Sequence, residues 1–215
     1  MSQEIVIFLH GYGTRGGLNG SKARFLHEQF RTYPSNVFYA IDFTPTPKDF
    51  QYHTITGMID RLRQYSLDRD LDTFTLIAIS QGANVALNYA HHYENVKRLL
   101  LLSPELYYDS YSTEEELQAW AERVDGLPFH YGFQKHLPLN YGHHQDGLRY
   151  VTPPPPPAPT TLFHGVNDTA IPLARSRQYA AQYPDLVHLI EVESDHFLND
   201  QHERIWAVTK EILGL

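Results

Sequence analysis

The 215-residue sequence contains no cysteine. Disulfide bonds, thiolate metal sites and cysteine nucleophiles are therefore excluded. An excess of basic residues is also missing, because 17 lysines and arginines stand against 25 aspartates and glutamates, for a formal net charge of -8. This balance argues against non-specific binding to nucleic acid or to anionic membrane surfaces.

Long hydrophobic runs are absent as well. No stretch approaches the roughly 20 consecutive apolar residues that a membrane-spanning helix needs. The apolar run at residues 5–9 is too short for the core of a signal peptide and lacks a basic leader. We therefore expect no membrane span and a soluble, cytoplasmic protein.

Short apolar runs alternate with amphipathic segments along most of the chain. The runs predicted as buried strands are residues 5–9, 37–41, 74–79, 96–102, 160–163 and 186–192. Between them, sets such as Ile55, Met58, Ile59 and Leu62 have the spacing of a helix with one apolar face. Alternating strands and helices predict an α/β fold with a doubly wound, mostly parallel sheet and right-handed crossovers.

The alternation lapses between about residues 104 and 159, which we predict to be a cap or lid insertion within a single domain, 1–215. One short helix is expected there, because Thr113 and Glu116 form a capping box ahead of an apolar face. That face is Leu117, Trp120, Ala121 and Val124. The rest is expected to be loop-like, ending in five prolines, 153–157, that favour a stiff extended spacer over a peptide-docking segment.

Polar residues follow four of the predicted strands. They are His10, Gly11 and Tyr12 after the first strand, Ser80, Gln81 and Gly82 after the third, Asp168 after the next-to-last, and His196 after the last. Ligands of open α/β sheets bind beyond the carboxyl ends of the strands. These residues are therefore expected to meet at one edge of the sheet.

Ser80 is predicted to be a catalytic nucleophile. Ala78 and Gly82 are the small residues of a sharp turn between a strand and a helix, and such a turn pushes the serine hydroxyl out of the sheet. The N-terminal N–H groups of the following helix would face a developing oxyanion. Isolated Ser-x-Gly sequences are mostly structural turns, so the setting between strand and helix carries this prediction.

Serine needs a base, and His196 is the best candidate because it follows the last strand and precedes the last helix. Asp168 is the predicted acid that orients the imidazole and stabilises its cation. Asp195 is the rival acid, ranked lower because sequence neighbours usually point apart. The chain order Ser, Asp, His is the one that α/β-hydrolases use.

The sequence resembles the α/β-hydrolase superfamily over nearly its whole length outside the insertion. Within it, the chain resembles the small YqiA-type esterases. The matching pieces are Leu9 to Tyr12, Ser21 to Ala23, Asp195 to Phe197 with the preceding strand, and the ending Leu213 to Leu215. Ala78 stands where the superfamily usually has glycine.

The resemblance implies Ser80 as nucleophile, His196 as base and Asp168 as acid. It further implies an oxyanion hole formed by the backbone N–H groups of Tyr12 and Gln81, with His10 ordering the loop. The predicted function is therefore a serine hydrolase that cleaves small-molecule carboxylic esters through an acyl-enzyme, with no metal and no cofactor. The alternatives are a thioesterase or lipase-like acyl hydrolase, and a non-catalytic ligand-binding protein with the hydrolase fold.

Three weaker signals remain open. The insertion's aromatic residues, Tyr107, Tyr108, Tyr111, Trp120, Phe129, Tyr131, Phe133 and Tyr141, either line an acyl or aryl pocket or pack the insertion onto the sheet. The histidines of the same segment lack the spacing of a metal site. Arg15 and Lys22 are expected to be exposed to solvent, although they could meet an anionic substrate. The physiological substrate and the oligomeric state do not follow from the sequence.

Overall fold

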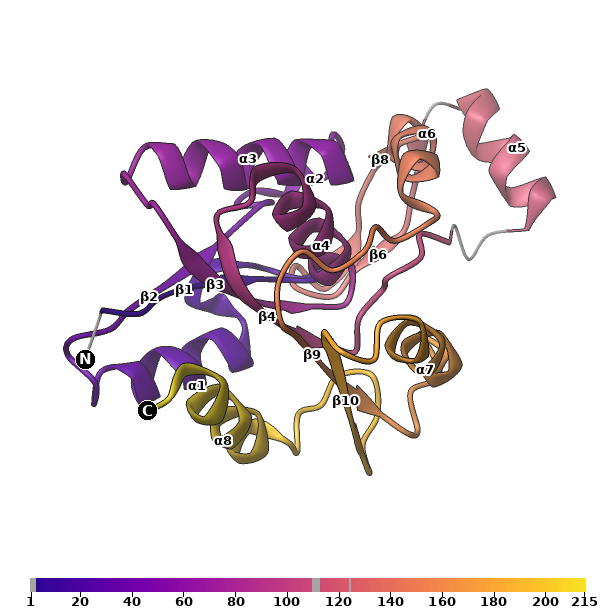
Figure 1. Cartoon of the computed structure of the whole chain (residues 1–215). Helices are drawn as coiled ribbons and strands as arrows, with labels where there is room; N and C mark the ends of the chain where they lie inside the picture. Colours follow the sequence, from indigo (N-terminus) through magenta and orange to yellow (C-terminus); the bar gives the residue numbers. More distant parts are fainter. Residues whose placement is uncertain (1–2, 110–112, 124) are drawn as a thin grey trace.

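Six parallel strands form the central sheet of the computed structural model, which describes residues 3–109, 113–123 and 125–215 (Figure 1). They are β1 (Ile5–Leu9), β2 (Val37–Ile41), β3 (Phe74–Ile79), β4 (Val96–Leu102), β9 (Thr160–Gly165) and β10 (Val187–Val192). The order across the sheet is β10-β9-β4-β3-β1-β2. The predicted α/β class with a doubly wound sheet is confirmed, and every pairing in this sheet is parallel.

The strands form where aliphatic residues are nearly continuous, because the sheet is covered on both faces. Leu99, Leu100, Leu101 and Leu102 of β4 are all buried. Four strands have the predicted bounds. The other two differ at one end: β9 continues to Gly165, and β10 begins one residue later than predicted, at Val187.

Helices cover both faces of the sheet (Figure 1). One face packs against α3 (Ile55–Leu67), α4 (Gln81–Tyr93) and α7 (Leu173–Gln182), and the other against α1 (Ser21–Phe30) and α8 (His202–Leu213). The short elements η1 (Gly17–Asn19) and α2 (Pro47–Phe50) lie in connections. Pro172 has an extended ψ of 122° and occupies the N-cap position of α7.

The segment predicted to be a cap insertion, residues 104–159, has more regular structure than predicted and is called the insertion below. Its elements are α5 (Glu114–Arg123), β5 (Asp125–Gly126), β6 (Phe129–His130), β7 (Lys135–His136), β8 (Leu139–Asn140), α6 (Gly142–Gly147) and η2 (Leu148–Tyr150). The prediction of a loop was wrong for α6 and η2 and for β5–β8, which form two small antiparallel pairs. Two-residue strands are too short to leave a periodic pattern in the sequence. The capping box of α5 is confirmed, since Thr113 Oγ1 accepts from Glu116 N and Glu116 Oε2 accepts from Thr113 N. Val124 and Tyr111 lie outside the described residues.

Hydrogen bonds tie the insertion to the sheet's carboxyl edge and to α3. The N–H of Gly132, between β6 and β7, donates to the carbonyl of Gly13, which follows β1 (3.2 Å). On the other side, Asp146 of α6 accepts from both the N–H (2.8 Å) and the hydroxyl (2.5 Å) of Thr56. The insertion therefore lies over the strand ends that carry the polar residues identified in the sequence. Within the described ranges, no helix is long and apolar enough to cross a membrane.

Candidate active site

Ser80 occupies a sharp turn between β3 and α4. Its φ of 54° and ψ of −124° are unusual for a residue with a side chain, and such backbone strain is common at functional sites. The turn requires a glycine at position 82, where a Cβ would lie 2.5 Å from the carbonyl oxygen of His10. These features place the Ser80 hydroxyl at the carboxyl edge of the sheet, as the predicted turn requires.

The structure brings Ser80, His196 and Asp168 into one chain of hydrogen bonds. The Nε2 atom of His196 lies 3.1 Å from Ser80 Oγ, and its Nδ1 atom lies 2.7 Å from Asp168 Oδ2. Asp195, the rival acid, instead accepts hydrogen bonds from the N–H groups of Phe197 and Leu198. Asp168 is thus the carboxylate that contacts the imidazole.

Asp168 is held from several sides. Its Oδ1 atom accepts from the N–H groups of Ala170 and Ile171, and its Oδ2 atom lies 3.2 Å from His164 Nε2 as well as against His196. Burial alone would raise the pKa of Asp168. The hydrogen bonds from His164, His196 and Ile171 more than offset it and hold the pKa below its usual range. The carboxylate is therefore ionised and fixed in direction.

His164 is a site residue that the sequence analysis did not single out. It is fully buried, and its Nδ1 atom lies 2.8 Å from the hydroxyl of Ser176 in α7. Nε2 faces two acceptors, Asp168 Oδ2 and the Ile171 carbonyl, so it carries the proton and Nδ1 accepts from the Ser176 hydroxyl. The only signal in the sequence is its position at the end of β9, four residues before Asp168.

The loop after β1 passes directly beside Ser80. A Cβ on Gly11 would lie 3.0 Å from Ser80 Cβ, so a glycine allows this approach. The carbonyl of Gly11 is bound by His10 Nδ1 and by the hydroxyl of Thr14, both at 2.9 Å. Because the C=O and N–H of a trans peptide point in opposite directions, this fixes the direction of the Tyr12 N–H. Gln81 begins α4, where N–H groups have no partner within the helix.

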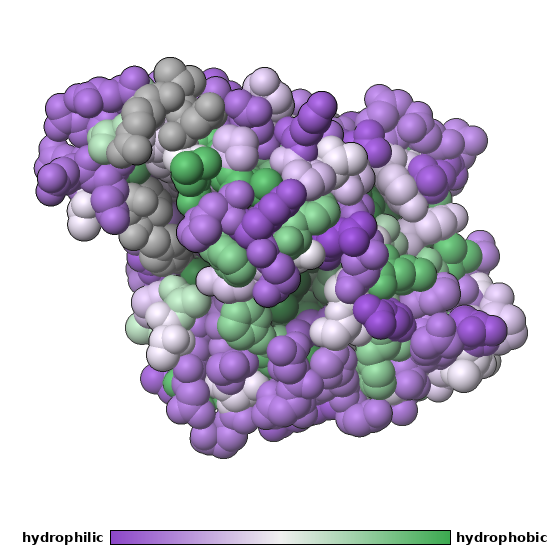
Figure 2. Space-filling view, turned by 180° about the vertical axis from the view of Figure 1, so that it is seen from behind, coloured by the Kyte–Doolittle hydropathy of each residue, from purple (hydrophilic) through white to green (hydrophobic). Residues whose placement is uncertain are grey.

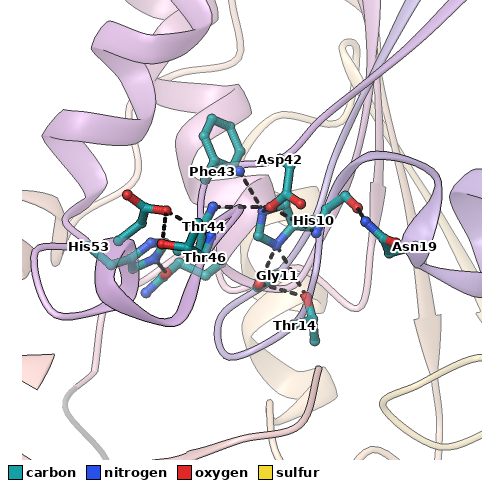
Figure 3. Close-up of polar contacts among 12 residues, drawn as sticks. His10, Gly11, Thr14, Asn19, Asp42, Phe43, Thr44, Thr46 and His53 are labelled. Atoms are coloured by element: carbon teal, nitrogen blue, oxygen red, sulfur yellow. Dashed lines mark hydrogen bonds and ion pairs between the residues drawn. The ribbon is translucent and has the colours of Figure 1, made fainter. Parts of the chain in front are cut away.

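The His10 ring lies between Asp42 and Phe43 on one side and Gly11 and Thr14 of this loop on the other (Figure 3). Its Nε2 atom accepts a hydrogen bond from the Phe43 N–H at 3.0 Å, so Nδ1 carries the proton that binds the Gly11 carbonyl. Burial lowers the pKa of His10 to about 4, although Asp42 acts in the opposite direction. This geometry fits the predicted role of His10 in ordering the loop.

Three further histidines are buried near this loop and in the insertion: His53, His130 and His143. His53 Nε2 lies 2.8 Å from Gln81 Oε1, and the rings of His53 and His143 stack with centroids 5.6 Å apart. His130 packs edge-on against Phe50. Burial lowers the pKa of all three histidines, to about 3 for His53. His53 is not among the predicted site residues, because nothing in its sequence neighbourhood marks a side chain that reaches α4.

A cavity of about 810 Å³ opens above Ser80 and His196, between the sheet edge and the insertion. On the face shown in Figure 2, hydrophobic residues gather around a hollow on the side of the insertion. Four of the aromatic residues predicted as lining do line this cavity: Tyr108, Trp120, Phe129 and Tyr131. Three others pack within the insertion or onto the core: Tyr107, Phe133 and Tyr141. Both uses proposed for these rings therefore occur.

The expectation that Lys22 is exposed was wrong. Its residue exposure is 7%, and its ammonium donates to Asn199 Oδ1 at 3.0 Å. Burial lowers the pKa of Lys22 to about 8, with Asp195 and Asp200 acting in the opposite direction. Lys22 lies in α1, so this contact ties the segment following His196 to the rest of the fold. Arg15 is half-buried over the Phe133 ring.

Comparisons with known proteins identify the fold. No protein-family model matches the chain, and no curated protein sequence matches it. Solved structures do match. Alpha/beta hydrolase domain-containing protein 10 of mouse is 22% identical, with a TM-score of 0.76 over 97% of this chain and 89% of that one.

Two microbial structures match over similar lengths. The monoacylglycerol lipase of Paleococcus ferrophilus is 13% identical, with a TM-score of 0.78 over 99% of this chain and 96% of that one. Est1E of Butyrivibrio proteoclasticus is 16% identical, with a TM-score of 0.67 over 99% of this chain and 87% of that one. These likenesses show that the chain has the α/β-hydrolase fold. The narrower resemblance to YqiA-type esterases stays a prediction. Among the described residues, no group of three or more potential ligands could hold a metal ion.

The buried histidines predict a loss of stability in mild acid. The unfolded chain takes up a proton at His53 below its ordinary pKa of 6.5, whereas the folded protein resists it down to about 3. Lowering the pH from 7 to 5 should therefore cost the folded state about 2 kcal/mol at this residue. Over the same pH range, the free energy of unfolding of His53→Gln, measured by urea denaturation, should fall by about 2 kcal/mol less than that of wild type. His188→Gln, at an exposed position of β10, serves as the control and should keep the wild-type pH dependence. Equal losses in wild type and His53→Gln would contradict this account.

Proposed function

We propose that the chain is a serine hydrolase that cleaves carboxylic esters by two-step acyl transfer. The observation that carries the proposal is the chain of hydrogen bonds from Asp168 through His196 to Ser80. This is the arrangement of nucleophile, base and orienting acid that activates a serine hydroxyl. It opens into a cavity large enough for a small-molecule substrate.

In the first step, Ser80 Oγ attacks the ester carbonyl carbon while His196 Nε2 takes the hydroxyl proton. Asp168 stabilises the resulting imidazolium, to which it is already hydrogen-bonded. The N–H groups of Tyr12 and Gln81 bind the oxyanion, and each such donor contributes on the order of 3 kcal/mol to lowering the barrier. When the tetrahedral intermediate collapses, the alcohol leaves with the proton from His196 and an acyl-enzyme ester remains on Ser80.

In the second step, water attacks the acyl-enzyme and gives its proton to His196. The same two N–H groups hold the second oxyanion. Collapse releases the carboxylic acid, and the proton on His196 returns to Ser80 Oγ. Neither step of the proposed mechanism requires a metal ion or an organic cofactor.

The similar structures support hydrolysis of carboxylic esters rather than another reaction. Two of them carry the names monoacylglycerol lipase and carboxylesterase, and Est1E has been solved with ferulic acid bound. The cavity walls are also mainly apolar and aromatic. We propose an ester with an apolar or aromatic acyl group as the substrate class.

Serine-directed labelling tests the proposed function. A fluorophosphonate probe should label wild type and fail to label Ser80→Ala and His196→Ala. Turnover of p-nitrophenyl esters should fall about 10⁴-fold or more in both variants, and to a similar extent in Asp168→Asn. Asp195→Asn is the matched control, because its carboxyl contacts only loop N–H groups among the described contacts, and it should keep most of its activity. A folded wild type that neither labels nor hydrolyses any ester would contradict the proposal and favour a ligand-binding protein.

A second candidate, lipase-like action on longer acyl chains, is favoured by the rim of the cavity. Leu127, Tyr131 and Phe197 line the cavity and yet are 65%, 54% and 46% exposed. Exposed apolar residues around a pocket often bind an apolar ligand.

Substitution of the rim separates the two acyl classes. Leu127→Ser should raise the KM for p-nitrophenyl octanoate about threefold to tenfold, since it removes apolar contact area, and should leave the acetate ester unchanged. Leu148→Ser is the control, because this leucine is 54% exposed but lies outside the cavity. If Leu127→Ser changes neither ester, the rim does not bind the acyl chain.

A further inference from the structure

Glu105 is a buried carboxyl that the proposed mechanism does not use. It follows β4, and its backbone N–H donates to the carbonyl of Ser80 at 3.2 Å. The residue is 5% exposed, and what remains exposed lines the cavity above Ser80. An acidic residue is thus built into the wall directly beside the proposed nucleophile.

No cationic side chain pairs with Glu105 in the described part of the chain. Its carboxylate accepts a hydrogen bond from the backbone N–H of Asp109. Arg175 of α7 interacts with Glu105 electrostatically, but its guanidinium donates to Asp109 Oδ2 at 2.9 Å and to the Tyr107 carbonyl at 3.2 Å. A buried carboxyl without an ion-pair partner is costly unless it stays neutral or meets a charge from outside.

The remaining polar wall of the cavity consists of acidic side chains, uncharged side chains and the imidazoles of His143 and His196. Asp109 and Glu116 also line it, whereas the lining includes no lysine or arginine from the described residues. Tyr12 and Tyr108 also line the cavity. Burial raises the pKa of both hydroxyls, and the charge of Glu105 adds to the increase. An anionic ligand would therefore contact carboxyl, hydroxyl and aromatic groups, and no lysine or arginine among the described lining residues would pair with it.

Burial raises the pKa of Glu105 to about 8. The Asp109 N–H and Arg175 act in the opposite direction, and the Asp109 carboxylate adds to the increase. At pH 7 the side chain is thus mostly a neutral acid that can donate its O–H to a ligand. Above pH 8 it becomes a carboxylate.

We infer that Glu105 determines the charge specificity of this cavity, which selects uncharged and cationic substrates over anionic ones. An uncharged ester accepts a hydrogen bond from the Glu105 acid. An amidinium or ammonium group receives the Glu105 carboxylate as its counter-ion and packs against the aromatic faces. An anionic ligand loses the water that solvates its carboxylate and gains no positively charged partner in the cavity. The inference deepens the proposed function by naming the substrate's charge class, and it rests on that function only for identifying the ligand as a substrate.

Binding to a Ser80→Ala variant tests the inference without requiring turnover. Benzamidine, benzamide and benzoate are similar in shape but are cationic, neutral and anionic, respectively. Their affinities can be measured by titration calorimetry. At pH 7, benzoate should bind about tenfold or more weakly than benzamide. Between pH 7 and pH 9, benzamidine should gain about tenfold in affinity, because the ionised fraction of a group with a pKa near 8 rises by that factor.

A second substitution assigns the effect to one residue. In Ser80→Ala/Glu105→Gln, benzamide should bind as before, and the pH dependence of benzamidine binding should disappear. Ser80→Ala/Glu122→Gln, which changes an exposed glutamate on α5, should behave like Ser80→Ala alone. Near-ultraviolet circular dichroism checks that each variant keeps its tertiary structure.

The inference fails if benzoate binds as tightly as benzamide, if benzamidine binding does not change with pH, or if that change survives Glu105→Gln. Absence of binding by all three probes would also overturn it, since the cavity would then not receive small ligands of this class. Charge-selective binding in a chain whose wild type hydrolyses no ester would instead refute the proposed function alone.

Discussion

His196 lies between a carboxylate and a hydroxyl, and the arrangement of the rest of the site depends on those two contacts. The three residues come from the carboxyl ends of β3, β9 and β10, so the parallel order of the sheet brings them together. Asp168 can orient the ring because the N–H groups of Ala170 and Ile171 and the buried His164 fix its direction. The strained turn at Ser80 positions the hydroxyl that contacts the other nitrogen of the His196 ring. A small displacement at any of these strand ends would separate the donors from their acceptors.

The surroundings of this contact are buried polar groups that stay uncharged. Burial keeps His10 and His53 neutral at pH 7, and it keeps Glu105 mostly protonated. Asp168, by contrast, is held ionised by its hydrogen bonds. A single buried negative charge beside His196 stabilises the imidazolium of the proposed mechanism more strongly than it would in water, because the local dielectric is low. The insertion contributes to this environment by covering the strand ends and supplying His130 and His143.

The fold could be predicted from the sequence because its signals are local. The aliphatic runs of β1 to β4 and the turn around Ser80 mark strand ends, and the polar residues that follow them indicated which side chains the sheet would bring together. The insertion could not be predicted in the same way, because its two-residue strands are held by distant contacts such as Gly132 with Gly13. For the same reason His164, His53 and Glu105 went unassigned. Their environments depend on packing between segments far apart in the chain, and the burial of Lys22 is a further instance.

The most direct test of the central claim is peptide-mapping mass spectrometry of the wild-type protein, quenched in acid during turnover of p-nitrophenyl butyrate. The account predicts a butyryl group on Ser80, in an amount that rises with the initial release of p-nitrophenol. Asp168→Asn should accumulate this adduct more slowly than wild type. Turnover with the acyl group on another residue, or with no acyl group on the protein and undiminished activity in Ser80→Ala, would contradict it.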